Sequence, residues 1–171
     1  MNLKEFLNLS AGRWFSQRTN YPLGGEADNS KADITIELIN PEDAKAVELC
    51  KKYNLDPQLS LGGTIQSWDN SVDWGKPKQI GSAIVVLVSN PDDDTIGKLI
   101  RPQDSGVCGH YALGADKALT LTIETDEMQA EERQWFASDN FKMRTTFVEF
   151  SDGRKQTSFY SEIRKAPPKE E

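Results

Sequence analysis

Charged residues recur at alternate positions in EERQWFASDNFKMRTT (131–146), the stretch whose residue types are best suited to chemistry. On either side of a turn at 139–140, two runs alternate in the way that paired strands do. Alternate residues of a strand face opposite sides of the sheet, so Glu132, Lys142 and Arg144 would share one face. Two interpretations are open: this face lies in water, or it lines a barrel that holds a charged ligand.

Burial of the two cations would require an anionic partner, because an unpaired charge is costly away from water. That partner would be Glu132 or the carboxylates of a ligand. Arginine suits carboxylates, since its planar guanidinium donates two parallel hydrogen bonds. A flat conjugated ligand could lie against tryptophans, although tryptophan more often packs in a core; the chain has four, at 14, 68, 74 and 135. The residues alone leave both interpretations open.

Other catalytic residue sets are scarce. His110 is the only histidine, so a histidine metal site or a Ser-His-Asp triad would depend on it alone. The glycine pairs at 24–25 and 62–63 match neither a P-loop nor a dinucleotide-binding motif. The acidic run 92–94 lacks the spaced ligands and the glycine of a calcium loop. We therefore predict no metal site and no cofactor.

Length and composition indicate one ordinary globular domain of 171 residues with net charge −7. This acidic balance argues against nucleic-acid binding. The longest apolar run, AIVVLV at 83–88, is too short to cross a bilayer, so no membrane association is expected. The segment 1–10 lacks the pattern of a secretory signal. Cys50 and Cys108 form no metal-ligand spacing and are expected to be reduced thiols in the cytosol or a similar compartment.

Two short helices are expected, at 2–9 and 41–53. Asn2 can cap the first helix, and Trp14 should lie buried close to it. Asn40 would cap the second helix, with Pro41 at its first helical position.

Almost all of the remaining chain alternates as strands separated by turn residues. The expected strands are 12–20, 32–39, 62–69, 71–75, 80–89, 96–102, 106–113, 118–126, 128–138, 140–150 and 154–164. About ten strands with short turns predict an all-β fold, an antiparallel up-and-down barrel, because closure hides the edges that an open sandwich leaves free. One barrel domain at 1–165 would be followed by a disordered tail at 166–171.

Several segments carry a resemblance to a known family. Gly12-Arg13-Trp14, after a short helix, resembles the Gly-x-Trp signature of lipocalin barrels. More specifically, the chain resembles the S-type phycobiliprotein lyases of the CpcS/CpeS family, nearly end to end. The joint pattern consists of LSAGRWFSQRT (9–19), EERQWFASDN (131–140), the cation-x-Arg-Thr segment that follows and SFYSEIRK (158–165).

The resemblance implies a lipocalin-like barrel that binds an open-chain tetrapyrrole, phycoerythrobilin or phycocyanobilin. It implies a lyase that joins this bilin by a thioether bond to a cysteine of an apo-phycobiliprotein alpha or beta subunit. A homodimer or a second lyase subunit would fit the same family. The implied location is the cytoplasm of a cyanobacterium, or of one infected by a phage, or a plastid stroma.

The family's site residues carry over by position. Glu132 matches the pocket carboxylate, and Lys142 and Arg144 match a cation-x-cation pair, with Glu132 and Arg144 as the catalytic candidates. Thr146 matches the hydroxyl that follows, and Glu162 the acid near the last strand. Many members read Arg-x-Arg-x-Ser here, whereas Lys142 offers a point charge rather than a fork. Further substrate-binding candidates are Arg18, Trp68 and Trp74.

A mechanism follows from this assignment. Lys142 and Arg144 would hold the two propionates of the bilin, and Glu132 would accept hydrogen bonds from its pyrrole nitrogens, favouring a protonated and more electrophilic chromophore. Neither Cys50 nor Cys108 need act covalently. Two other classes are possible: a non-catalytic bilin carrier, and an interaction module whose charged face is only solvated.

Overall fold

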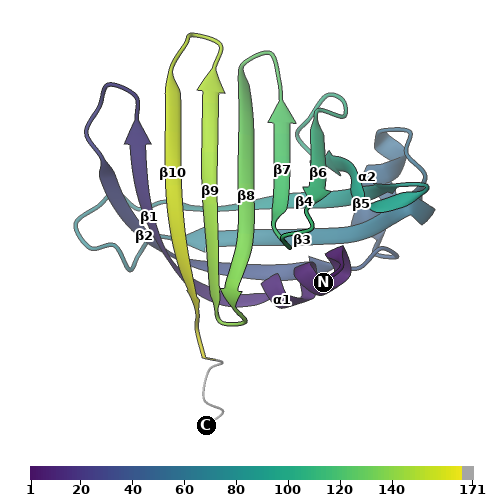
Figure 1. Ribbon diagram of the computed structural model, residues 1–171, viewed down its shortest axis with the longest axis horizontal. Coiled ribbons are helices and arrows are strands. Elements are labelled where there is room, and N and C mark those ends of the chain that lie inside the picture. Colours follow the sequence, from purple (N-terminus) through teal and green to yellow (C-terminus); the bar gives the residue numbers. More distant parts are fainter. Residues whose placement is uncertain (167–171) are drawn as a thin grey trace.

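The computed structural model describes residues 1–166 and contains a closed barrel in which each strand pairs antiparallel with the next and β1 pairs with β10 (Figure 1). The ten strands are β1 (Gly12–Pro22), β2 (Asp28–Ile39), β3 (Ser60–Asp69), β4 (Ile80–Asn90), β5 (Asp93–Ile100), β6 (Gly109–Leu113), β7 (Leu119–Glu124), β8 (Met128–Ser138), β9 (Phe141–Phe150) and β10 (Lys155–Arg164). The predicted up-and-down barrel is confirmed, and the open sandwich is excluded. Of the tail predicted at 166–171, residues 167–171 lie outside the described residues.

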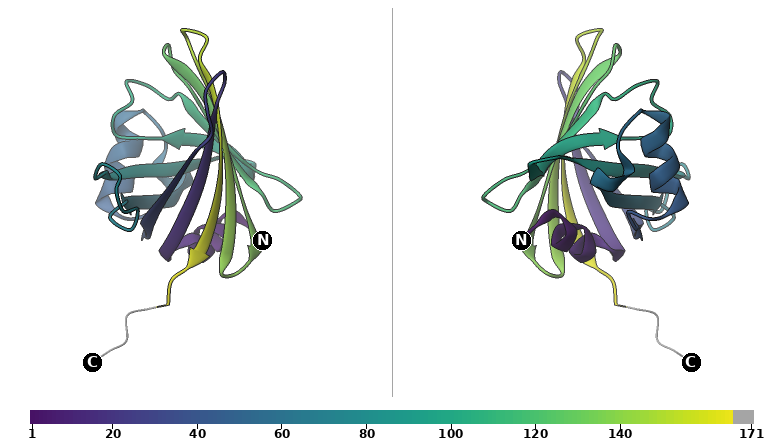
Figure 2. Two further views of the ribbon diagram at one scale, coloured as in Figure 1. Left: turned by 90° about the vertical axis from the view of Figure 1, so that its left-hand side faces the viewer. Right: turned by 90° about the vertical axis from the view of Figure 1, so that its right-hand side faces the viewer.

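The barrel has two walls whose strands run crosswise. In Figure 1, β8, β9 and β10 stand upright in front, and β3 and β4 run across behind them. The side views of Figure 2 show the same two walls meeting along β1 and β2. Inward-facing side chains of both walls therefore point into a shared interior.

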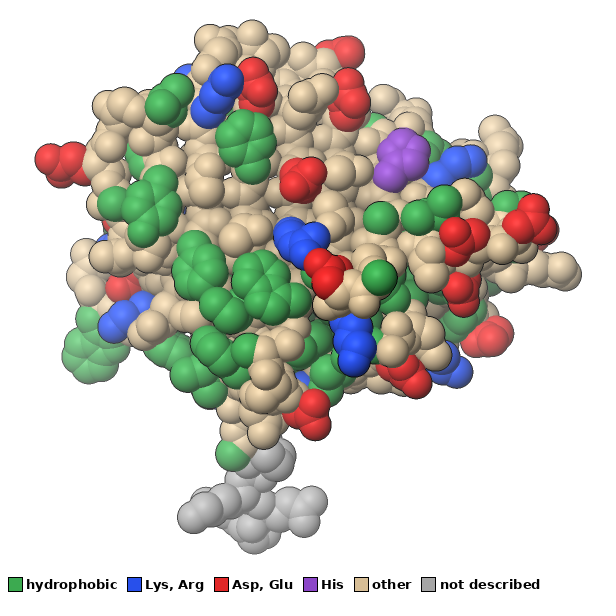
Figure 3. Space-filling view, viewed as in Figure 1, with side chains coloured by type: hydrophobic (Ala, Val, Ile, Leu, Met, Phe, Trp, Pro, Cys, Tyr) green, Lys and Arg blue, Asp and Glu red, His purple; other side chains and the backbone are tan. Residues whose placement is uncertain are grey.

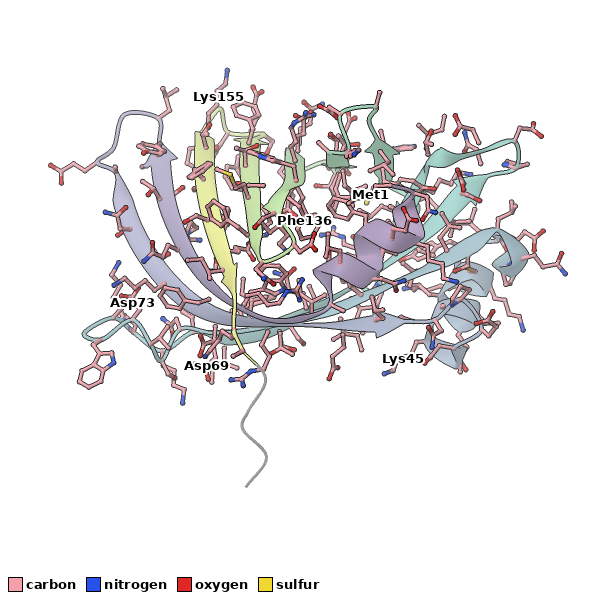
Figure 4. All side chains as sticks on the ribbon, turned by 60° about the horizontal axis from the view of Figure 1, so that its bottom comes forward. Met1, Lys45, Asp69, Asp73, Phe136 and Lys155 are labelled. Carbon is pink, nitrogen blue, oxygen red and sulfur yellow. The ribbon has the colours of Figure 1, made fainter. Side chains whose placement is uncertain are left out.

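Helix α1 (Leu3–Ser10) covers one end of the barrel, with the predicted cap: Asn2 accepts a hydrogen bond from the Glu5 amide at 2.9 Å. Its apolar face buries Phe6 completely, and Phe6 meets Phe136 with ring centroids 5.0 Å apart. In Figure 4 Phe136 lies beside this helix. Trp14 is fully buried next to it, as expected, and its indole Nε1 donates to the Ser10 carbonyl at 2.9 Å.

Helix α2 (Ala44–Lys52) packs on the outside of the barrel and begins later than predicted. Asp43, not Asn40, is its cap, because the Asp43 carboxylate accepts a hydrogen bond from the Lys45 amide at 2.9 Å. Pro41 therefore lies in the turn before the helix. A short 3-10 helix, η1 (Pro57–Leu59), links α2 to β3. The buried Cys50 packs with Val86, Val88 and Ile100 in an apolar cluster beneath α2.

The strand predicted at 71–75 is wrong, because residues 70–79 form a loop between β3 and β4. The Asp69 carboxylate accepts a hydrogen bond from the Ser71 amide at 2.8 Å. The Asn70 side-chain oxygen accepts one from the Gln79 amide at 2.6 Å. Such side-chain bonds to nearby backbone compete with strand pairing and favour a turn. Asp69 and Asp73 mark this loop in Figure 4.

The remaining differences are at strand ends. β2 begins at Asp28 rather than at 32. The strands predicted at 96–102 and 106–113 are Asp93–Ile100 and Gly109–Leu113, so the β5–β6 loop spans 101–108. Because the strands run up and down, this loop, the 70–79 loop and the β1–β2, β7–β8 and β9–β10 turns all lie at the end opposite α1. We call that end the mouth.

No helix of residues 1–166 is long and apolar enough to cross a membrane.

Candidate functional site

The charged face of β8 and β9 points into the barrel. Lys142 is 1% exposed and Arg144 6%, and Glu162, on the neighbouring β10, is 0% exposed. Strand register explains this grouping. Lys142 pairs with Glu162, and Glu132 pairs with Thr146, which lies two residues from Arg144 and therefore on the same face of β9. The solvated-face interpretation is therefore excluded. The outer surface of the same strands carries hydrophobic side chains (Figure 3).

The four inward charges form one network, the buried charge cluster of Glu132, Lys142, Arg144 and Glu162. Arg144 Nε donates to the Glu162 carboxylate, and Arg144 Nη1 donates to Glu132 Oε2 at 3.1 Å. Lys142 Nζ lies 3.7 Å from Glu162 Oε2. The cluster holds as many cations as carboxylates, so attraction within it offsets the cost of removing each ion from water.

Burial affects the two cations differently. Removal from water lowers the pKa of Lys142 to about 8, although Glu162 acts in the opposite direction. Burial also opposes the charge of Arg144, but Glu162 and Glu132 outweigh it and raise the Arg144 pKa above its usual range. Arg144 therefore stays charged at every physiological pH, and Lys142 is the member of the pair that can lose its proton.

Aromatic rings pack against both cations. The Arg144 guanidinium carbon lies 3.9 Å from the centroid of the Tyr160 ring. Lys142 Nζ lies 5.1 Å from the centroid of the Trp14 ring, and the Arg164 guanidinium carbon lies 4.2 Å from the same ring. Lys142 is thereby enclosed near the α1 end of the barrel, below the cavities described next.

The barrel interior contains two adjoining cavities. The apolar lobe, of about 430 Å³, is lined by aliphatic side chains from β4 to β7, by α1, and by Glu132, Gln134 and Thr146. The charged lobe, of about 490 Å³, lies toward the β1–β2 turn and the 70–79 loop. Its lining includes Arg18, Lys31, Lys76, Asp28, Asp73 and Trp68. Both lobes are of the size of small-molecule sites.

Gln66, Arg144 and Tyr160 line both lobes, and we call these three residues the waist. A ligand longer than one lobe must therefore pass the Arg144 guanidinium. No hydrogen bond from Arg144 Nη2 is found among residues 1–166, so this nitrogen is available to a ligand.

Arg18 is a further arginine of the interior. It lines the charged lobe, and within residues 1–166 its buried Nε has no hydrogen-bond partner and its guanidinium makes no ion pair. A buried unpartnered N–H is costly, so a ligand acceptor would satisfy it.

The predicted site residues fall into three groups. Glu132, Arg144 and Thr146 line the apolar lobe, and Arg18 and Trp68 line the charged lobe. Lys142 and Glu162 line neither lobe and support Arg144 from below. Trp74 is 91% exposed on the 70–79 loop, outside both lobes.

Three residues at the centre of the site were not among those predicted from the sequence: Gln66, Gln134 and Tyr160. Gln134 donates a hydrogen bond to Glu132 Oε1, so both carboxylate oxygens of Glu132 receive a donor. The signal for two of them was present, because Gln134 and Tyr160 lie two positions from Glu132 and Glu162 and therefore share their faces.

The thiols offer little reactivity. Burial raises the pKa of both Cys50 and Cys108, which reduces the thiolate fraction at neutral pH. Among residues 1–166 no group of three or more histidine, cysteine, aspartate or glutamate side chains is arranged to hold a metal ion.

Comparisons with known proteins bear on this barrel and its charge cluster. A family model described as CpeS-like protein matches residues 2–165. The chain is 37% identical over 169 residues to the chromophore lyase CpcS/CpeS of Thermosynechococcus vestitus, covering 96% of this chain and 93% of that protein. It is 37% identical over 175 residues to chromophore lyase CpcS/CpeS 1 of Synechocystis sp., covering 99% and 94% of the two chains.

A solved structure has the same architecture. The S-type phycobiliprotein lyase CPES from Guillardia theta matches with a TM-score of 0.85 at 27% identity, over 98% of this chain and 94% of that chain. In fold, length and sequence, this chain thus agrees with these proteins along the whole barrel. The chain belongs to the CpeS-like family, the CpcS/CpeS group that its sequence resembles.

Proposed function

We propose that this protein is a phycobiliprotein chromophore lyase. It binds an open-chain tetrapyrrole, phycoerythrobilin or phycocyanobilin, in the two lobes and joins it by a thioether bond to a cysteine of an apo-phycobiliprotein subunit. The observation that carries the proposal is the buried charge cluster at the junction of two cavities, with arginine nitrogens left open to a ligand. The names of the relatives, chromophore lyases, support the same activity.

Two arginines bind the propionates in this proposal. Arg144 offers Nη2 while its other nitrogens stay on Glu132 and Glu162, and Arg18 offers its unpartnered Nε. Charge-assisted hydrogen bonds to carboxylates are the strong ones. Lys142 supports the arrangement through Glu162, since 1% exposure leaves it little room to contact a ligand. Thr146 and Trp68 contribute to the walls, and Trp74 is positioned to meet only what enters at the mouth.

Glu132 interacts with the pyrrole nitrogens. Its carboxylate is held by Arg144 and Gln134, and its side chain keeps 26% exposure toward the apolar lobe. A fixed anion at that place accepts pyrrole N–H bonds and stabilises a protonated, more electrophilic bilin.

The bond-forming step is an addition. The thiolate sulfur of the acceptor attacks the ethylidene carbon of the bilin, a C–S bond forms, and the electron pair of the C=C bond moves into the protonated conjugated system, leaving a neutral product with no leaving group. The barrel contributes by holding one bilin conformation with the reacting end toward the mouth. Its own thiols take no part.

Absorption spectroscopy and adduct formation test the proposal. Mixing the purified chain with phycocyanobilin or phycoerythrobilin should give a red-shifted, sharpened band. Adding an apo-phycobiliprotein subunit should then give a coloured adduct on that subunit that resists denaturation. The band without the adduct would identify a non-catalytic carrier, and absence of the band would leave an interaction module.

A further inference from the structure

Three inward side chains form a single row across the barrel wall. Arg18 on β1 pairs in register with Tyr160 on β10, and Tyr160 pairs with Arg144 on β9. Neighbouring strands are about 4.8 Å apart, so the two arginine backbones stand about 10 Å apart with the tyrosine between them. We call this row the Arg–Tyr–Arg rung.

Tyr160 contacts the arginine whose position the charge cluster fixes. Its ring lies 3.9 Å from the Arg144 guanidinium, which Glu132 and Glu162 hold from the other sides. The ring also lines both lobes, and among residues 1–166 its hydroxyl makes no hydrogen bond. Tyr160 therefore presents a ring surface at the place where the two lobes meet.

The chemistry of a bilin matches this spacing. Its two propionates extend from the two central pyrroles, which are neighbours joined by one methine bridge, and its end pyrroles extend in opposite directions. With one propionate on each arginine, the methine bridge lies over the ring between them. One end pyrrole then enters the apolar lobe and the other the charged lobe.

We propose that Tyr160 determines specificity by spacing: it keeps the guanidinium groups of Arg18 and Arg144 apart so that they bind the two carboxylates of one ligand, and it carries the centre of that ligand on its ring. This inference rests on the proposed function, since it names the part of the same site that selects a planar dicarboxylate. A tyrosine that merely fills space would not distinguish ligands with one and two carboxylates.

Binding of phycocyanobilin and of its monomethyl and dimethyl esters tests the spacing. We expect the unchanged protein to bind the diacid on the order of a hundredfold more tightly than the dimethyl ester, with the monoester between, because each charge-assisted bond contributes about tenfold. Tyr160→Phe is the conservative variant: it keeps the ring and should therefore retain the preference for the diacid over the monoester, whatever its absolute affinity. Tyr160→Leu should bring the affinities for the diacid and the monoester to within a few-fold of each other. It should also broaden the absorption band of the bound bilin.

Two further variants complete the design. Phe159→Leu is the matched control, because Phe159 is the next residue of β10, faces outward and is 36% exposed; it should leave affinities and spectrum unchanged. Arg18→Gln removes one end of the rung without touching Tyr160, so it should also abolish the preference for the diacid over the monoester. Circular dichroism and thermal unfolding establish that each variant is folded.

The outcomes separate the two proposals. If the unchanged protein binds none of the three bilins, the proposed function fails. If it binds them and either Tyr160→Leu or Arg18→Gln, when folded, keeps the wild-type preference for the diacid, the spacing role of Tyr160 is overturned. If Tyr160→Leu does not fold, Arg18→Gln decides alone, because the rung requires both arginines to bind one carboxylate each.

Discussion

Arg144 Nη1 lies 3.1 Å from Glu132 Oε2, and this contact joins a wall of the apolar lobe to the waist. The same guanidinium bonds Glu162 through Nε, so one side chain fixes carboxylates from β8 and β10. Ion pairs among the four charges offset the cost of burying them, although within residues 1–166 Glu162 Oε2 makes no hydrogen bond and has Lys142 Nζ 3.7 Å away. Arg144 Nη2 remains for a ligand. The side chains of the buried charge cluster therefore hold one another in position.

Arg144→Ala should weaken phycobilin binding on the order of tenfold to a hundredfold, because one charge-assisted hydrogen bond is worth roughly 1.5–3 kcal/mol. It should also lower the free energy of unfolding by roughly 3–5 kcal/mol, since Glu162 would stay buried without its closest partner. Absorption titration and urea unfolding measure the two effects. Arg154→Ala, on the exposed β9–β10 turn, is the control. Wild-type affinity in Arg144→Ala would limit Arg144 to a structural role.

Glu132→Gln should keep much of the bilin affinity while reducing the absorption shift and the transfer rate. The amide still accepts a hydrogen bond but no longer stabilises a positive charge on the bilin. Absorption spectra and single-turnover transfer to an apo-subunit measure this. Glu149→Gln, on the outer face of β9 and outside both lobes, is the matched control. Equal spectra and rates in both variants would contradict the assigned role of Glu132.

Lys142 should make stability rise with pH. Burial lowers its pKa in the folded chain to about 8, from 10.5 for an unperturbed lysine. Between these values the unfolded chain binds the proton and the folded chain does not, so the free energy of unfolding contributed by this group increases with pH across that window.

Lys142→Arg provides the comparison, because arginine stays charged over the whole range. The difference in unfolding free energy, wild type minus variant, should grow from pH 8 toward pH 10, measured by urea unfolding at several pH values. Bilin binding at pH 7 should be close to wild type, since Lys142 lines neither lobe and both side chains are charged at that pH. A difference that stays constant with pH would contradict a lowered pKa.

The double change Cys50→Ser, Cys108→Ser should retain bilin transfer. Burial keeps both thiols protonated, and the nucleophile in the proposed reaction belongs to the acceptor. Stability should fall modestly, because Cys50 packs with apolar neighbours under α2. Mass spectrometry of this chain during transfer gives a second readout. A covalent bilin on either cysteine that is required for turnover would refute this prediction.

Much of the fold could be predicted from alternation and turn residues. The period of two along β8, β9 and β10 is enough to place Glu132, Lys142, Arg144 and Glu162 on shared faces. Closure followed from the number of strands and the need to hide their edges. The failure at 71–75 has a local cause: Asp69 and Asn70 bond the backbone of their own loop, and this competes with strand pairing.

Only the tertiary structure decided which face is inside. Alternation relates residues to one another, but both faces of β9 carry apolar side chains, and Phe147 on the outer face is 43% exposed. Glu162 meets Lys142 through the register of the β9–β10 hairpin, but the Trp14 ring, far away in sequence, meets Lys142 only when β1 closes on β10. The same closure sets Arg18 beside Tyr160. Residue pattern determined the strands and their shared faces, hairpin register brought the four charges together, and barrel closure made their face the inner one and added Arg18 to it.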